Sequence, residues 1–143
     1  MRRYLVVAHQ TLTSPEVLDT MRVRAGEEET VFHLVVPLHH GEGWTWTEGH
    51  DRAVATRRID EASQQMASAG LTVTGEIGAT DSPVNCVDDV LRRDGVEVYD
   101  GIIVSTLPVT VSKWLKLDVP SRIQRLTTLP VEHIVGHPAD IAV

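Results

Sequence analysis

Polar side chains follow two of the apolar segments of this chain of 143 residues. His9, Gln10 and Thr11 come directly after the apolar run 4–8, and Ser105 and Thr106 follow the apolar run 101–104. If the two runs are neighbouring parallel strands, these donors and acceptors meet at one edge of a sheet, where α/β proteins bind ligands. The pattern therefore predicts a polar crevice for a small ligand, although polar residues are also expected there as caps and loop partners.

Ser112 and Lys113 extend this candidate crevice. They stand at the expected start of a helix, where the helix dipole and an ammonium charge together favour an anion. Trp114, the next residue, is expected to pack on the sheet rather than to stack on a base.

The loop after the run 101–104 lacks the residues that a phosphate site needs. No glycine lies between Gly101 and Gly136, and Leu107-Pro108 stands where phosphate-binding loops carry glycines. Glycine lets backbone N–H groups approach a phosphate closely, whereas proline removes a donor and side chains add bulk. Asp118 adds a carboxylate that would repel a triphosphate unless a metal bridged them. ATP or AMP is thus possible but disfavoured, and no cofactor is predicted.

Metal and nucleophile chemistry have weaker support in the sequence. His39, His40 and His50 flank a glycine-containing stretch, but their spacing matches no tight zinc motif. A plain surface loop over 38–50 is favoured, and no metal site is expected.

Cys86 lies within an apolar-periodic segment and is predicted to be a packing residue, and no nucleophile-elbow motif occurs. No catalytic residue is assigned, and enzyme activity is left open, with a leaning against it.

Alternating strand and helix patterns predict an α/β fold. Apolar and β-branched runs indicate strands, and positions recurring at steps of three and four indicate helices. Ser14-Pro15 and Ser82-Pro83 are typical helix starts, Gly26 is placed to end the first helix, and Pro120 predicts a break within the last. A single domain, 1–143, with a doubly wound parallel sheet and helices on both faces is expected. The expected strands are 4–8, 31–36, 71–77, 101–105 and 131–135, and the strand 71–77 is expected near a sheet edge.

Composition limits the cellular compartment and the classes of partner that are expected. The net charge is −7, and the arginine doublets are scattered rather than gathered, so nucleic acid is not expected as a partner. No apolar run approaches the ~18 residues that suggest a membrane span, and no membrane partner is expected. The single cysteine suits a reducing compartment, and the protein is expected to be cytoplasmic.

Several of these segments resemble the universal stress protein superfamily over nearly the whole chain. They are residues 4–11, 32–37, 99–106 and 129–135, with the Pro83 turn. The resemblance implies the sheet order 3-2-1-4-5 and dimers formed through the last strand. Its ATP-binding branch carries an aspartate where this chain has His9, and a glycine-rich signature that would begin near Ser105. The chain resembles a member that lacks this signature.

The function predicted from these observations is a non-enzymatic stress-response or regulatory domain with a degenerate nucleotide site. It would act through homodimers and through a protein partner or small ligand that the sequence does not identify. Val131, His133 and Val135 are the interface candidates, because an apolar last strand would otherwise leave an open sheet edge. One alternative is an ATP- or AMP-binding universal stress protein that uses side chains for the phosphates. Another is a small-molecule enzyme of the wider adenine nucleotide hydrolase-like group.

Overall fold

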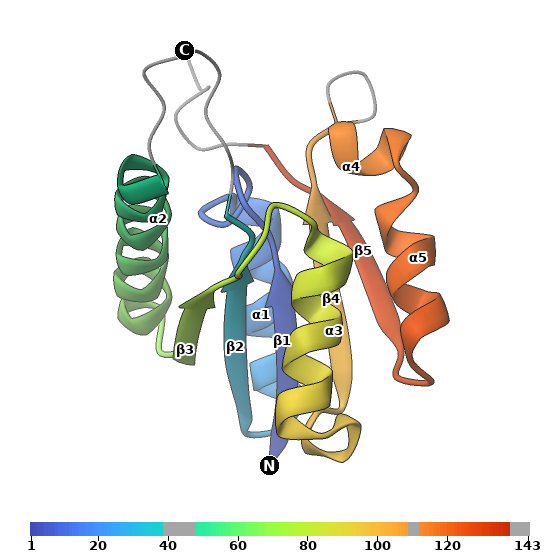
Figure 1. Cartoon of the computed structure of the whole chain (residues 1–143). Coiled ribbons are helices and arrows are strands. Elements are labelled where there is room, and N and C mark those ends of the chain that lie inside the picture. Colours follow the sequence, from blue (N-terminus) through green and yellow to red (C-terminus); the bar gives the residue numbers. More distant parts are fainter. Residues whose placement is uncertain (39–47, 109–111, 138–143) are drawn as a thin grey trace.

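Five parallel strands form the centre of the computed structural model, which describes residues 1–38, 48–108 and 112–137 (Figure 1). Their order is β3-β2-β1-β4-β5, as the resemblance implied. The α/β prediction is therefore confirmed, and the carboxyl ends of β1 and β4 lie side by side. The strands are β1 (Arg2–Val7), β2 (Thr30–Val36), β3 (Thr72–Ile77), β4 (Gly101–Thr106) and β5 (Val131–Val135).

Helices cover both faces of the sheet and enclose two apolar cores (Figure 1). On one face, α1 (Pro15–Glu27) and α2 (Glu48–Ser68) pack on side chains such as Phe32 and Ile103. On the other, α3 (Pro83–Asp94) and α5 (Val119–Leu126) pack on side chains such as Leu5 and Val104. Alternate residues of each central strand serve opposite cores, which is why these strands are apolar throughout. The 3-10 turn η1 (Val96–Val98) joins α3 to β4, and α4 (Lys113–Lys116) precedes α5.

The predicted helix starts are confirmed at atomic detail. The Ser14 hydroxyl accepts a hydrogen bond from the Val17 N–H at 3.3 Å, and Ser82 does the same for Asn85 at 3.2 Å. A proline follows each cap at the first helical position, where its missing N–H costs nothing. Local chemistry alone therefore places both helix starts.

Two expected boundaries were wrong, and the expected break in the last helix was confirmed. Helix α1 continues through Gly26 to Glu27, and α2 begins at Glu48, so the expected loop to His50 is too long. The last helix is two helices, α4 and α5, separated at Asp118, whose φ of 56° is left-handed. The predicted break before Pro120 is thus confirmed, and it takes the form of a sharp turn.

Strands β3 and β5 are the two edges of the sheet. The prediction that 71–77 is a half-exposed strand near an edge is confirmed by the mixture of exposed and half-buried positions in β3. Among the described residues, no helix combines the length and the apolar character needed to cross a bilayer.

Candidate functional site

The candidate crevice contains a closed pair of hydroxyl groups. Thr11 lies in the turn between β1 and α1, and Ser105 lies near the end of β4. Their side-chain oxygens are 2.6 Å apart, and the two residues are 2% and 1% exposed. One hydroxyl donates to the other, so each side-chain oxygen has a hydrogen-bond partner within the chain.

Gly136 covers this pair. After β5 the backbone N–H of Gly136 donates to the Thr106 carbonyl at 2.8 Å, which carries the chain across the end of β4. A Cβ at position 136 would lie 2.7 Å from the Ser14 Oγ, 2.9 Å from the Thr11 Cβ and 3.1 Å from the Ser105 Oγ. Glycine is required here for space, and the chain's own backbone occupies this part of the crevice.

Two polar contacts, one of them an ion pair, tie β5 and the residues after it to helix α1. The Arg24 guanidinium donates to Glu132 at 2.6 Å, and His137 Nδ1 lies 2.6 Å from Glu16 Oε1. Burial raises the pKa of Glu16, but the hydrogen bond and positive charge of His137 outweigh it, and the pKa is below its usual range. These contacts hold residues 132–137, which include Gly136, against α1.

Ser105 and Thr106 face opposite sides of the sheet. Ser105 pairs with Thr11 beneath α1, whereas the Thr106 hydroxyl lies 2.7 Å from His133 Nε2 on β5. Burial lowers the pKa of His133, which favours the neutral imidazole in this contact. The two adjacent polar residues therefore belong to two separate contacts rather than to one crevice wall.

The other predicted site residues have different surroundings. Ser112 is buried, and its hydroxyl caps α4 by accepting from the Leu115 N–H at 3.1 Å. Lys113 and Gln10 are exposed, and His9 is half-buried. The Ser112 hydroxyl is thus already engaged within the chain, whereas Lys113 extends into solvent. Trp114 packs against the core beneath α3 and α5, as expected.

The interface candidates on β5 differ in exposure. Val131 is half-buried and packs against the core, whereas Val135 is 41% exposed at the end of the edge strand. His133 is held by Thr106, as described above.

Metal and thiol chemistry find little support in the described part of the chain. His39 and His40 lie outside the described residues, as does the side chain of His50. Over residues 1–38, 48–108 and 112–137, no group of three His, Cys, Asp or Glu side chains could hold a metal ion. Cys86 is buried, its Sγ donates to the Thr80 carbonyl at 3.4 Å, and burial raises the pKa of its thiol. This confirms Cys86 as a packing residue.

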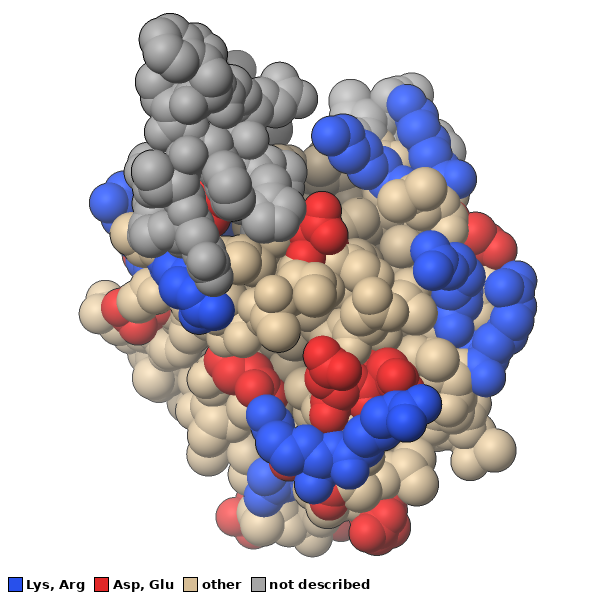
Figure 2. Space-filling view, in the orientation of Figure 1, with Lys and Arg blue, Asp and Glu red and all other residues tan. Residues whose placement is uncertain are grey.

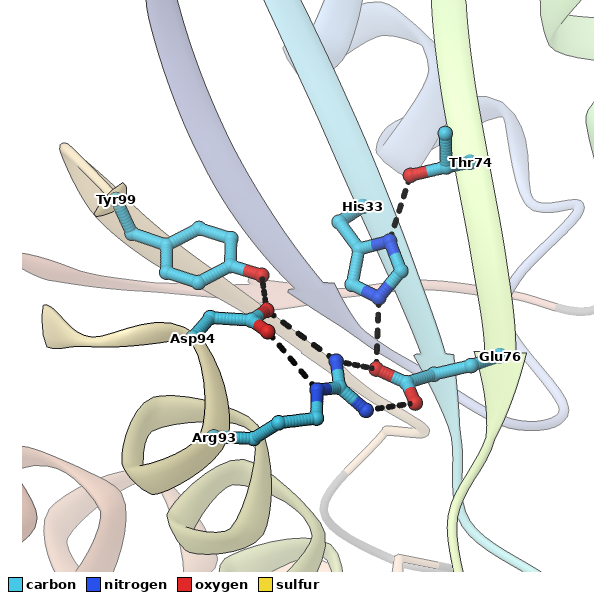
Figure 3. A network of polar contacts seen from close by, with 6 residues as sticks. All are labelled: His33, Thr74, Glu76, Arg93, Asp94 and Tyr99. Carbon is cyan, nitrogen blue, oxygen red and sulfur yellow. Dashed lines mark hydrogen bonds and ion pairs between the residues drawn. The ribbon is translucent and has the colours of Figure 1, made fainter.

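A network of polar side chains that was not predicted from the sequence lies beside α3, at the edge of the sheet formed by β3 (Figure 3). Its centre is a bidentate pair in which Arg93 donates to both oxygens of Glu76 at 2.7 Å. Arg93 also donates to Asp94 at 2.8 Å, and Asp94 accepts from the Tyr99 hydroxyl at 2.6 Å. We call it the β3 network; it consists of His33, Thr74, Glu76, Arg93, Asp94 and Tyr99.

His33 joins this network to the sheet. Its Nε2 lies 2.7 Å from Glu76 and its Nδ1 lies 2.6 Å from the Thr74 hydroxyl. Because a carboxylate only accepts, Nε2 donates to Glu76, and in the neutral ring Nδ1 accepts from Thr74. The signal in the sequence was the alternation of polar residues on β3, which places Thr74 and Glu76 on one face.

The β3 network borders a cavity of about 150 Å³ between the end of β3 and α3. Glu76 and Arg93 line one side, and Val35, Cys86 and Val90 line the rest with neighbouring residues. The charged groups are already paired with each other across the network. It binds β3 to α3 on the face of the strand opposite to the α2 core, against which Val73 and Ile77 pack.

The arginine holds the pKa of both carboxyls low. Arg93 lowers the pKa of Glu76, and Arg93 followed by Tyr99 lowers the pKa of Asp94 from 3.8 to about 2. Burial and the contact with Asp94 raise the pKa of the Tyr99 hydroxyl. The network is therefore strongest when both carboxyls are ionised.

Arg93→Met is expected to lower the free energy of unfolding by about 1 kcal/mol at pH 6, a small value because exposed pairs are screened by solvent. A carboxyl with a lowered folded-state pKa contributes stability above its unfolded pKa and loses it as the folded form is protonated. The difference should therefore vanish as the pH falls from 3.8 to about 2, the two values for Asp94. Urea unfolding of both proteins across this range measures it.

Arg92→Met is the matched control. Arg92 forms an exposed helical pair with Asp88 at 2.9 Å and takes no part in the β3 network. Its loss should cost no more than ~0.5 kcal/mol. Equal pH dependence in the two variants would show that Arg93 does not stabilise the carboxyls of the network.

The fold is that of universal stress proteins. The universal stress protein from Archaeoglobus fulgidus in complex with dAMP matches with a TM-score of 0.64 at 16% identity, over 94% of this chain and 97% of that chain. A protein of the universal stress protein family from Burkholderia pseudomallei matches at 0.59 and 19% identity, over 96% of each chain. A universal stress protein in complex with cAMP matches at 0.59 and 15%, over 95% of this chain and 98% of that one.

No protein-family model and no curated protein matches the sequence. At these low identities the structural likeness concerns the fold, and on that point it agrees with the resemblance seen in the sequence.

Proposed function

We propose that the protein is a non-enzymatic, universal-stress-protein-like domain with a degenerate nucleotide site. It would act in the cytoplasm in stress response, as a homodimer that binds a protein partner or a small ligand. The observation that carries this proposal is the closed crevice: Thr11 and Ser105 bond to each other, and Gly136 covers them. A nucleotide bound against Thr11 and Ser105 would have to displace the backbone at Gly136 and break a buried hydrogen bond.

The loop after β4 supports the same proposal. Leu107 and Pro108 replace the glycines that phosphate cradles use, and Pro108 has no N–H to donate. The Ser112 hydroxyl is engaged as the cap of α4, a helix of only four residues. Phosphate recognition would therefore depend on exposed side chains such as Lys113.

An adenine-nucleotide-binding function is the second candidate. Two solved structures with this fold hold dAMP and cAMP, which favours it. In this chain such binding would use His9, Gln10 and Lys113 instead of a glycine loop. A nucleotide retained through purification would support it.

The dimer is proposed from the position of β5. This strand ends one edge of the sheet, and Val135 is 41% exposed there. An open edge with an apolar side chain favours pairing with a second copy.

Native mass spectrometry of freshly purified protein is expected to show a dimer without retained nucleotide. Val135→Lys should shift the population to monomer, because a charged side chain on an edge strand opposes pairing. Val23→Lys is the control, since Val23 is 61% exposed on α1 and should leave the dimer intact. Monomer alone at tens of micromolar would exclude the dimer, and a stoichiometric adenine nucleotide would establish the second candidate.

A further inference from the structure

The segment that follows β4 has the opposite charge to the rest of the chain. The whole chain holds 13 Lys and Arg against 20 Asp and Glu. Between Asp100 and Glu132, however, the basic residues Lys113, Lys116, Arg122 and Arg125 face a single acid, Asp118. A local excess of positive charge therefore lies on an acidic protein.

The structure places all four of these side chains on the surface. Lys113 and Lys116 are three residues apart on α4, and Arg122 and Arg125 are three apart on α5, so each pair shares a helix face. Figure 2 shows Lys and Arg side chains over α4 and α5 at the right of the view. A second basic band, over α3, lies directly against acidic side chains (Figure 2).

Several cations elsewhere in the chain are paired with carboxylates. Arg2, Arg24 and Arg93 contact carboxylates at 2.6 to 2.7 Å. Within residues 1–38, 48–108 and 112–137, Arg125 alone of the four forms an ion pair, with Asp118 at 3.4 Å. The charge on this surface is thus largely uncompensated within the chain.

Apolar side chains lie among the cations. Leu117 is 59% exposed at the turn between the two helices, and Leu126 is 40% exposed at the end of α5. The buried Val119 and Ile123 hold α5 on the core, so its outer face is fixed in position. We call these exposed residues the α4–α5 surface: Lys113, Lys116, Leu117, Arg122, Arg125 and Leu126.

We infer that the α4–α5 surface binds an acidic segment of a partner protein that carries an apolar residue between its carboxylates. Complementary charge gives such a contact specificity and a high association rate, and the exposed Leu117 side chain offers an apolar contact point. A long polyanion or an anionic membrane fits less well, because the remainder of the surface is acidic and would repel it. An acidic segment would then be the partner class of the proposed partner-binding function, on which this contact rests.

Asp118 lowers the net positive charge of this surface. It is exposed, is the acid that faces the cations, and occupies the left-handed turn between α4 and α5. Asparagine tolerates that conformation as well as aspartate does. Asp118→Asn therefore removes the negative charge without disturbing the turn.

Fluorescence anisotropy with a labelled peptide of glutamate pairs separated by leucines tests the inference on the full chain. Binding is expected at low salt and should weaken steeply at high salt. The double variant Lys116→Glu with Arg122→Glu should weaken it by about tenfold or more. Asp118→Asn should tighten it by about two- to fivefold.

The matched control is Arg22→Glu with Arg57→Glu. Both arginines are exposed, on α1 and α2, and the double variant has the same net charge as the test variant. Binding close to the wild-type value in this control supports the α4–α5 surface. Equal loss in both double variants, or no binding by the wild type at low salt, would overturn it.

Two further binding measurements distinguish an acidic protein segment from other polyanions. Vesicles containing phosphatidylserine and a short DNA duplex should bind more weakly than the peptide; tighter binding of either would overturn the acidic-segment assignment. The readout is peptide binding, so failure of this inference is distinct from failure of the proposed dimer or of the proposed degenerate nucleotide site.

Discussion

Ile123→Ala is expected to lower the free energy of unfolding by about 2–5 kcal/mol. Ile123 is 0% exposed and lies on the buried face of α5, in the core that also includes Val119. The helix has only eight residues, which is too short for its own hydrogen bonds to hold it. Loss of this anchor leaves a cavity and loosens the helix that carries Arg122 and Arg125. Urea unfolding followed by circular dichroism measures the change.

Ser121→Ala is the matched control for the same helix. Ser121 is exposed, and its replacement should change stability by no more than ~0.5 kcal/mol. If Ile123→Ala also stayed within that range, α5 would not be held on the core through Ile123.

Gly136→Ala is expected to destabilise the protein by about 1–3 kcal/mol. The added methyl group would lie 2.7 Å from the Ser14 Oγ and 2.9 Å from the Thr11 Cβ. Neither neighbour can yield easily, because Ser14 caps α1 and Thr11 is bonded to Ser105. The same urea experiment reports the loss.

Gly26→Ala should have the opposite sign. Gly26 lies inside α1, and nothing is within 4 Å of the position that a Cβ would take. Alanine in a helix interior should stabilise by roughly 0.5–1 kcal/mol. A neutral or stabilising Gly136→Ala would show that the segment after β5 does not cover the crevice as described.

Elements with a strong local signal were predictable. The caps at Ser14 and Ser82 depend on a hydroxyl and the backbone three residues later, which adjacent sequence specifies. The break near Asp118 followed from Pro120, which cannot continue a helix. Gly26 misled because glycine weakens a helix interior without forbidding it.

The candidate site was predictable only in outline. The sequence placed Thr11, Ser105 and Thr106 at strand ends, and the structure confirms that β1 and β4 are neighbours. The pairing of Thr11 with Ser105 joins residues 94 apart in sequence, and no local pattern encodes it. The contact of His33 with Glu76 joins residues 43 apart and was missed for the same reason.

By itself the sequence determined the alternating α/β class, the two capped helix starts and the local excess of basic residues between Asp100 and Glu132. These depend on near neighbours and on composition, which the order of residues contains directly. Only the tertiary structure decided that Gly136 covers the Thr11–Ser105 pair, and that the basic residues of α4 and α5 remain exposed and mostly unpaired. Such outcomes depend on which distant segments pack together, because burial and pairing are properties of the assembled sheet and helices.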